Sequence, residues 1–418
     1  MSAGQRVAIT GLGALTPVGS GPAGLWRGVL RGESAVRHIT RFDASAFPSR
    51  LAAEVDSASF DPSDWLEPRL VRRLDRYSQL AVVASAQAVQ DAGLDLGEPR
   101  LRERMGCYIG SALGGIAFAE HQHGSFVARG IGSVSPQLAL AVFGGAAPAN
   151  VAMHLALQGP NQANSNSCAS GAIAIGEAAH LIRGGDVPAM LAGGVEAPLA
   201  PLTFASFALV KAMSRANECP PRASRPFDAA RDGFVMGEGA AMLVLESFEH
   251  ARARGAHVYA EVRGYATTTD AYHMLEPRPD GSQAGRAIQL ALADAEVGAG
   301  EVDYVYAHAS ATRIGDRAEA LAIRRALGEH AAHVPVSGTK GLCGHPLGAS
   351  GAIETAIAAL AIEADWIPGT TNLEAPDDEI DLNLVPPGGQ PQELRVVLKN
   401  AFGFGGINAA LVLGRATP

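Results

Sequence analysis

Residues 159–185, GPNQANSNSCASGAIAIGEAAHLIRGG, decide how this chain is interpreted. Polar residues lead up to Cys168, and small residues then open an apolar stretch with helical spacing. A cysteine at a helix N-terminus faces unpaired backbone N–H groups, which favour its thiolate form. Ala169, Ser170 and Gly171 add little bulk, so we expect a substrate carbonyl to approach Cys168 closely. Taken alone, such a segment more often holds a buried structural cysteine.

The surroundings of Cys168 are uncharged. Residues 130–176 contain no Asp, Glu, Lys or Arg, although the whole chain has a net charge of -9. We expect this run to be mostly buried, with Cys168 in a dry environment. The run could also supply a subunit interface, because one core rarely needs so long an uncharged segment. Pro148, Asn150 and His154 interrupt it, which favours core over a membrane span.

Two histidines stand at predicted loop tips, where functional residues concentrate. His308 follows the strand-like VDYVYA and precedes ASATRIGD, and His345 lies in the glycine-rich TKGLCGHPLGASGA before an apolar helix. Two neutral imidazoles can donate hydrogen bonds to a carboxylate, or to the enolate oxygen that forms when the carboxylate leaves. A Cys–His–Asp hydrolase would need only one of them.

The chain uses lysine at three positions, Lys211, Lys340 and Lys399, among 33 basic residues. We interpret Lys340, five residues before His345, as the partner of Glu354 in an ion pair that holds the histidine loop. Near the end of the sequence, NAFGFGGINAALVL indicates a tight turn between strands. That turn would place an aromatic ring at a cavity mouth.

Composition limits the function classes. The net charge of -9 and the pI near 5.7 argue against a nucleic-acid-binding protein. The cysteines are scattered and MSAGQRVAIT lacks the apolar core of a signal peptide, which suits a reducing cytoplasm. Cys343 and His345 lack the further ligands of a metal site, so we expect no metal.

Strand-like runs alternate with Ala-rich helical stretches along the chain, which predicts an α/β fold. With 418 residues, of which 47% are hydrophobic, the chain is long enough for a large core. The most charged connection is ESFEHARARGAH at residues 246–257. We therefore expect two halves, residues 1–256 with the cysteine and residues 257–418 with the two histidines.

The segments around Cys168, His308, His345 and the final turn resemble, in order and spacing, those of β-ketoacyl-acyl-carrier-protein synthases. The likeness is greatest to the synthase II type and its type II polyketide relatives. It covers essentially the whole chain, from VAITGLGALTPVG (7–19) through SRPFDAARDGFVMGEGAAMLVLE (224–246) and TTDAYHM (268–274) to NAFGFGGIN (400–408). It implies an α/β thiolase fold with two similar halves in five α-β-α-β-α layers, usually as a homodimer.

The resemblance also implies an acyltransferase, a ketosynthase of fatty acid or polyketide biosynthesis. Cys168 would take an acyl group from a carrier-protein thioester. Malonyl-carrier protein would then lose CO2 with help from His308 and His345, and its carbanion would attack the acyl-enzyme. The backbone N–H groups of Cys168 and Phe404 would form the oxyanion hole, and Phe404 would gate the acyl pocket. The phosphopantetheine belongs to the carrier protein, so the chain needs no cofactor of its own.

The same resemblance assigns binding roles to further residues. Leu113, Phe207 and Phe402 would line the acyl and substrate pocket. Ser310 and Thr312 would hold the pantetheine arm. Lys211, Arg72 and Arg73 would contact the acidic carrier protein. Two departures from the family pattern lie near this region. Ala309 and Ser310 stand where the family usually has Gly-Thr, and Leu275-Glu276 follows DAYHM where Thr-Ser/Ala is common. They affect the substrate more than the chemistry and favour a specialised pathway.

Three alternatives have distinguishing features. A chain-length-factor subunit, the non-catalytic partner in a ketosynthase heterodimer, characteristically lacks the nucleophilic cysteine that this chain has. A CoA-dependent thiolase would use a second cysteine near the C-terminus, but the last one here is Cys343. A synthase III would have Asn in place of His345. Pairing with a chain-length-factor-like subunit stays open beside the homodimer.

Overall fold

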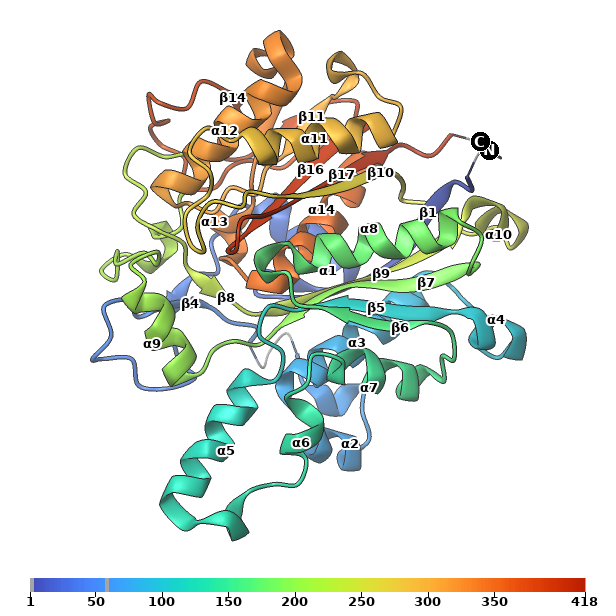
Figure 1. Cartoon of the computed structure of the whole chain (residues 1–418), viewed down its shortest axis with the longest axis vertical. Coiled ribbons are helices and arrows are strands. Elements are labelled where there is room, and N and C mark those ends of the chain that lie inside the picture. Colours follow the sequence, from blue (N-terminus) through green and yellow to red (C-terminus); the bar gives the residue numbers. More distant parts are fainter. Residues whose placement is uncertain (1–3, 57–59, 418) are drawn as a thin grey trace.

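The computed structural model describes residues 4–56 and 60–417 of the chain. Its elements stack in five layers, α-β-α-β-α, which Figure 1 shows from top to bottom. The expected α/β layering is therefore confirmed. The helices of the outer and central layers are α11 (Ser282–Asp294) and α12 (Arg313–Leu327) at the top, α14 (Ser350–Ala364) and α8 (Ser170–Arg183) in the centre, and α3 (Arg76–Asp91) and α7 (Ala146–Leu155) below.

The lower strands come from the first half of the chain. Their order is β1-β9-β7-β5-β6, where β9 is antiparallel to both neighbours and β7, β5 and β6 are parallel. The bounds are β1 Val7–Thr16, β9 Gly239–Ser247, β7 Ala189–Glu196, β5 Gly106–Gly110 and β6 Asn161–Asn164. Every residue of β1, β7 and β9 is buried, as expected for strands covered on both faces.

The upper strands repeat this pairing. Their order is β10-β17-β16-β11-β12, with β17 antiparallel to both neighbours and the last three parallel. The bounds are β10 Ala260–Thr269, β17 Ile407–Gly414, β16 Val396–Gly403, β11 Tyr304–Tyr306 and β12 Pro335–Ser337, with β14 (Asn383–Leu384) added at the edge. Two residue pairs between β1 and β10 join the halves. The repeated order indicates a duplicated unit, and the division at residues 256/257 stays a prediction.

The two central helices begin alike. Residues 168–173 read CASGAI at the start of α8, and residues 348–353 read GASGAI at the start of α14. The helices touch through the shared glycine: a Cβ on Gly171 would lie 2.9 Å from the Ala352 nitrogen, and one on Gly351 would lie 2.7 Å from the Ala172 nitrogen. The small residue that we expected to admit substrate thus serves helix packing. The internal repeat itself is a signal that the sequence interpretation missed.

The largest hydrophobic cluster contains residues of the lower strands, of the upper strands and of both α8 and α14. Each half has one further cluster beneath its outer helices: α3 and α7 cover one, and α11 and α12 cover the other. The window Leu347–Ala364 is apolar enough to cross a membrane, but 89% of it is buried inside the protein. It is therefore explained as a core helix. The two ends of the described part of the chain meet, since Arg6 Nη2 donates to the Thr417 carbonyl over 2.8 Å.

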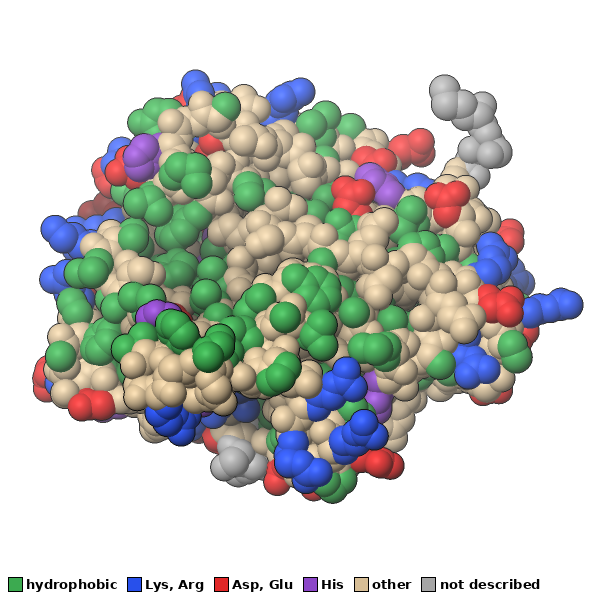
Figure 2. Space-filling model, turned by 60° about the horizontal axis from the view of Figure 1, so that its bottom comes forward, with side chains coloured by type: hydrophobic (Ala, Val, Ile, Leu, Met, Phe, Trp, Pro, Cys, Tyr) green, Lys and Arg blue, Asp and Glu red, His purple; other side chains and the backbone are tan. Residues whose placement is uncertain are grey.

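The uncharged run is less buried than expected. Helices α5 (Ile116–Arg129) and α6 (Leu138–Ala141) project from the body in Figure 1, and the chain around them is largely exposed. Phe143 is 48% exposed and Met153 is 67% exposed. Figure 2, which brings this side forward, shows hydrophobic side chains across the middle of the face and charged ones mostly toward its edges. Burial within one chain is thus the wrong explanation for this part of the run.

Candidate active site

The nucleophile candidate precedes the first central helix. Cys168 lies in a 3-10 turn, Ser167–Ala169, that continues into α8, and it is 5% exposed. Burial raises the pKa of its thiol to about 11, against the lowering effects of the Ser167 hydroxyl, the Lys340 charge and the Phe404 N–H. The thiol is therefore protonated at neutral pH. Burial outweighs the thiolate stabilisation that we expected at this helix N-terminus.

His308 is held from both sides. The Glu319 carboxylate accepts the backbone N–H groups of His308 and Ala309, both over 2.7 Å. Lys340 Nζ donates to the His308 carbonyl and lies 3.4 Å from its Nδ1. Because an ammonium group can only donate, Nδ1 accepts and the ring proton lies on Nε2. Burial, helped by the Lys340 charge, holds the pKa of His308 well below its usual value, so the ring is neutral.

His345 is anchored by the other half of the chain. Its N–H donates to the Val235 carbonyl over 2.7 Å, and its carbonyl accepts from Gly237 in β8 (Met236–Gly237) over 3.0 Å. Its Nδ1 lies 2.7 Å from the Ser350 hydroxyl at the start of α14. Burial and the nearby Lys340 lower the pKa of His345 well below its usual value. The two imidazole centroids are 5.3 Å apart, with the rings at 81°.

The ion pair expected between Lys340 and Glu354 is present and buried, with both side chains at most 3% exposed. Lys340 lies in α13 (Lys340–Cys343) and Glu354 in α14. The second carboxylate oxygen of Glu354 pairs with Lys399 Nζ over 2.8 Å. Two lysines thus share one carboxylate behind the histidines.

These groups meet in one cavity of about 370 Å3. The predicted site residues that line it are Cys168, Lys211, His308, Ser310, Thr312, His345, Phe402 and Phe404. Lys340 and Glu354 lie behind its wall. Leu113, Phe207, Arg72 and Arg73 do not line it; Arg73 faces a separate hollow beside α7. Among the residues that the structure describes, no group of three or more His, Cys, Asp or Glu side chains is placed to bind a metal.

Phe404 closes one side of the cavity. It lies in the turn between β16 and β17, and its ring stacks on Phe207 at 6.2 Å between centroids and 16° between planes. Gly403 brings this turn against Cys168, since a Cβ there would lie 3.0 Å from the Cys168 nitrogen. Leu113 and Phe207 pack with Cys168 in one hydrophobic cluster. Neither of them lines the cavity, although both pack in the cluster that contains Cys168.

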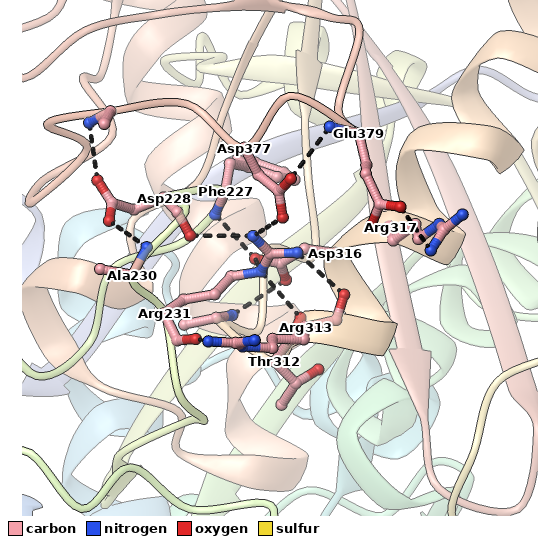
Figure 3. Close-up of polar contacts among 12 residues, drawn as sticks. Phe227, Asp228, Ala230, Arg231, Thr312, Arg313, Asp316, Arg317, Asp377 and Glu379 are labelled. Atoms are coloured by element: carbon pink, nitrogen blue, oxygen red, sulfur yellow. Dashed lines mark hydrogen bonds and ion pairs between the residues drawn. The ribbon is translucent and has the colours of Figure 1, made fainter.

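The loop after His308 is held by buried charges. Asp316 accepts from the Ala311 N–H over 3.0 Å, and its other oxygen lies 3.4 Å from Nε of the buried Arg231 (Figure 3). Burial raises the pKa of Asp316 to about 7. Ala309 has a φ of +48°, the region that favours glycine, and its Cβ occupies the space left by Gly338, where a Cβ would lie 2.3 Å away. The departure from the family's glycine is therefore tolerated at a cost in backbone strain.

The carboxylates that hold these loops were not found from the sequence. Asp316 and Glu319 lie with Ile323 on the buried face of α12, so two acids at apolar positions of one helix were the available signal. Glu196 ends the fully buried β7 and accepts from the Leu113 and Gly348 N–H groups over 3.1 and 2.9 Å. Burial raises the pKa of Glu196 to about 7.

Comparisons with known proteins agree with this geometry. Residues 4–251 match the β-ketoacyl synthase N-terminal domain, and residues 259–374 match the β-ketoacyl synthase C-terminal domain. The chain is 45% identical over 416 residues to a Streptomyces cyaneus protein that carries a polyketide β-ketoacyl synthase name, with 98% of each chain covered. It is 42% identical over 411 residues to 3-oxoacyl-[acyl-carrier-protein] synthase 2 of Coxiella burnetii, covering 98% and 99% of the two chains.

Solved structures give the same result. A β-ketoacyl synthase from Burkholderia phymatum superposes with a TM-score of 0.91 at 36% identity, covering 99% of this chain and all of the other. A type II polyketide ketosynthase, solved with its acyl-carrier protein and bound to a hexaketide, matches with a TM-score of 0.91 at 34% identity and the same coverage. With both domains matched and relatives similar over nearly their full length, the chain belongs to the β-ketoacyl synthase family and is an acyltransferase-type enzyme with the thiolase fold.

Proposed function

We propose that this enzyme joins an acyl group, carried on Cys168, to a malonyl unit delivered by an acyl carrier protein. The observation that carries the proposal is the meeting of Cys168, His308 and His345 in one buried cavity, with both imidazoles neutral. In the first half-reaction the Cys168 sulfur attacks the thioester carbonyl of an acyl carrier protein. The acyl group passes to Sγ, and the thiol proton passes to the departing pantetheine sulfur.

The second half-reaction uses the histidines. The bond between the malonyl carboxylate and its methylene carbon breaks, CO2 leaves, and the electron pair forms an enolate. The Nε2–H of His308, whose Nδ1 accepts from Lys340, donates to the enolate oxygen, and His345 donates beside it with the Ser350 hydroxyl as the donor to its Nδ1 in this proposal. The methylene carbon then attacks the acyl thioester on Cys168. The backbone N–H groups of Cys168 and Phe404 hold the oxyanion until Sγ leaves as a thiolate, which then takes a proton from water.

Phe404 acts as the gate of the acyl pocket in this proposal. Its ring stacks on Phe207, which packs in the same cluster as Leu113, and this supports an acyl chain reaching Leu113 only when the Phe404 ring swings aside. The glycines that follow, Gly405 and Gly406, have φ of +85° and +69°, which gives this turn a backbone that L side chains rarely adopt. Leu113 and Phe207 would then limit chain length.

The pantetheine arm would enter past Ser310 and Thr312, whose hydroxyls lie 2.9 Å apart in the cavity wall. Leu275 and Glu276, the second departure from the family pattern, also line this wall. Their position supports a role in selecting the substrate of a specialised pathway. Lys211 lies exposed at the same cavity and would attract the acidic carrier protein. Arg72 and Arg73, which end α2 (Pro68–Arg73), would extend this contact outside the cavity.

We also propose that the working enzyme is a dimer in the cytoplasm. The apolar face around Phe143 and Met153 and the edge strand β6, whose first three residues are exposed, support a subunit contact. A related structure is titled as the ishigamide ketosynthase/chain length factor, which supports a heterodimer as the alternative to a homodimer. The buried Cys168 favours the catalytic role in either assembly.

Intact-mass analysis with a panel of acyl carrier proteins and malonyl-carrier protein tests the function. The wild-type protein should gain the mass of one acyl group and release CO2 from malonyl-carrier protein. Cys168→Ala should stay folded but gain no acyl mass, while Cys168→Gln should lose loading and keep decarboxylation because it imitates the acylated state. A covalent acyl-enzyme in Cys168→Ala would refute the assignment of the nucleophile.

A further inference from the structure

Lys399 has no part in the reaction described so far. It lies in β16, is 0% exposed, and is one of the three lysines in a chain that otherwise uses arginine. Burying an ammonium group is costly unless an opposite charge and hydrogen bonds compensate it. An uncharged residue would fill a strand position in the core at no such cost. The buried Lys399 charge therefore needs an explanation beyond packing.

The contacts of Lys399 lead to His308 by two routes. Its Nζ lies 2.8 Å from Glu354 Oε2, while the other oxygen of Glu354 binds Lys340, the partner of His308 Nδ1. Lys399 also donates to the carbonyl of Asn400, whose amide donates to Glu319 over 3.1 Å. Glu319 holds the backbone of His308.

The surroundings of Lys399 fix its position. Its ammonium group lies 5.6 Å from the centre of the Tyr306 ring, on the neighbouring strand β11. Such a contact favours a cation over a neutral side chain. Tyr306 is itself held by a hydrogen bond between its hydroxyl and that of Thr339. The Lys399 ammonium group is therefore held in place behind the histidines by Glu354, Asn400 and Tyr306.

We propose that Lys399 is a positioning residue for malonyl decarboxylation, which holds Glu354 by the oxygen that Lys340 does not use. It thereby fixes the Lys340 ammonium group against His308 Nδ1 and keeps positive charge beside both imidazoles. The inference rests on the proposed function, because it assigns Lys399 to one half-reaction of that function.

The charged groups around the histidines decide the sign of a pH effect. Lys340 from α13 and Lys399 from β16 supply positive charge near both imidazoles. Glu354 from α14 pairs with the two lysines, and Glu319 from α12 accepts the backbone N–H of His308. Removing Lys399 takes one positive charge from this group, so each imidazole is protonated more easily. A protonated imidazole appears at a higher pH than before. The acid side of the decarboxylation profile should therefore move toward neutral pH.

The test compares Lys399→Met with the wild-type enzyme in two assays. CO2 release from malonyl-carrier protein, followed from the lowest pH at which the enzyme stays folded up to about pH 8, should show the acid limb displaced upward by roughly one pH unit. Acyl loading of Cys168, measured by intact mass, should change by less than about twofold because it does not use the Lys340–His308 contact. Arg395→Met, an equal charge change at the exposed residue just before the same strand, should leave the limb in place.

A folded Lys399→Met enzyme with an unchanged limb and unchanged decarboxylation would overturn the proposal. If that variant does not fold, Lys399→Gln, which keeps a donor toward Glu354 without the charge, should give the same shift. The variant Glu354→Gln supplies a second criterion: adding Lys399→Met to it should displace the limb less than in the wild-type background. A wild-type enzyme that neither loads acyl groups nor releases CO2 would refute the proposed function instead.

Discussion

At the scale of single residues, the Nδ1 partners of the histidines separate this site from a Cys–His–acid triad. Nδ1 of His308 faces the Lys340 ammonium group, and Nδ1 of His345 faces the Ser350 hydroxyl. In a triad, a carboxylate at that atom stabilises an imidazolium that has taken the proton of the nucleophile. Here the lysine opposes an imidazolium. Both rings are therefore suited to donate hydrogen bonds as neutral groups.

This difference predicts unequal effects on the two half-reactions. His308→Ala or His345→Ala should slow malonyl decarboxylation by roughly 100-fold, the order of loss when one donor to a developing oxyanion is removed. Acyl transfer to Cys168 should decrease much less. The two rates can be measured separately, as CO2 release and as acyl mass gained. Equal losses in both would indicate instead that one histidine activates the thiol.

The sequence predicts those site residues whose chemistry shows in their own segment. Cys168 and His345 stand beside small residues before apolar helices, and a local pattern is enough to select them. Glu319 and Lys399 could not be placed this way. Their roles depend on which face of α12 and which side of β16 meets His308, and contacts of that kind form between segments far apart in the chain. The sequence could show only that Lys399 was unusual.

At the scale of elements, α8 and α14 set the distance between Cys168 and the His345 loop. Their first turns touch through Gly171 and Gly351, where either Cβ would come within 3.0 Å of the opposite backbone. Backbone atoms at such a contact cannot move aside as a flexible side chain does. Any added volume must therefore push the two helix starts apart.

Gly171→Ala should lower the free energy of unfolding by about 1–3 kcal/mol, the range for overpacking a core. It should also slow decarboxylation, although it removes no group that touches substrate, because the His345 loop moves with α14. Gly24→Ala is the control: it lies in α1 (Gly21–Arg31), where a Cβ would make an ordinary contact at 3.6 Å. Urea unfolding and CO2 release should separate the variants. Equal stability of both would contradict this view of the helix contact.

A second element contact predicts how stability depends on pH. The buried Glu246, at the end of β9, binds Arg254, Thr10 and His250. Burial alone would raise the pKa of Glu246, but the hydrogen bonds from these partners, with that from His250 the largest, lower it to about 2 from 4.5. A carboxyl group whose pKa is lower in the folded than in the unfolded chain stabilises the fold at pH values above its unfolded pKa. That stabilisation is lost as the pH falls from about 5 toward 2.

Glu246→Gln should therefore cost on the order of 3 kcal/mol of unfolding free energy at pH 7. The difference from the wild type should shrink as the pH is lowered below about 5, where the wild-type carboxylate begins to lose its advantage. Urea unfolding of both proteins at pH 7 and at lower pH measures this. A difference that stays constant with pH would show that the carboxylate's ionisation contributes nothing.

At the scale of the whole molecule, the exposed apolar face calls for a partner. Met153→Glu should be harmless to a single chain, because the side chain is 67% exposed, but it would bury a charge in the proposed subunit contact. Light scattering should give twice 43.0 kDa for the wild type and 43.0 kDa for the variant. Leu290→Glu, on α11 and 41% exposed, should remain a dimer. A dimer mass for all three proteins would place the subunit contact elsewhere, and a monomer mass for the wild type would refute the homodimer.

The sequence and the structure agree on layering and disagree on this face. Alternating strand-like and helical runs indicated α/β layers, because periodicity reports which side of an element is apolar. The same periodicity does not distinguish burial inside a chain from burial between chains. The absence of charge in residues 130–145 likewise predicts burial without distinguishing the core from a subunit interface, and much of that segment is exposed in the single chain.

Because Arg6 and Thr417 are hydrogen-bonded, the two halves could be joined in the opposite order along the chain. A short linker could close the chain there, and a cut between α10 (Phe248–Ala253) and β10 could reopen it. During synthesis of the natural chain, the half with Cys168 leaves the ribosome first and keeps α8 uncovered until α14 is made. In the permuted gene α14 would come first. Cotranslational folding would then begin from the half that carries the histidines, with the same final cavity.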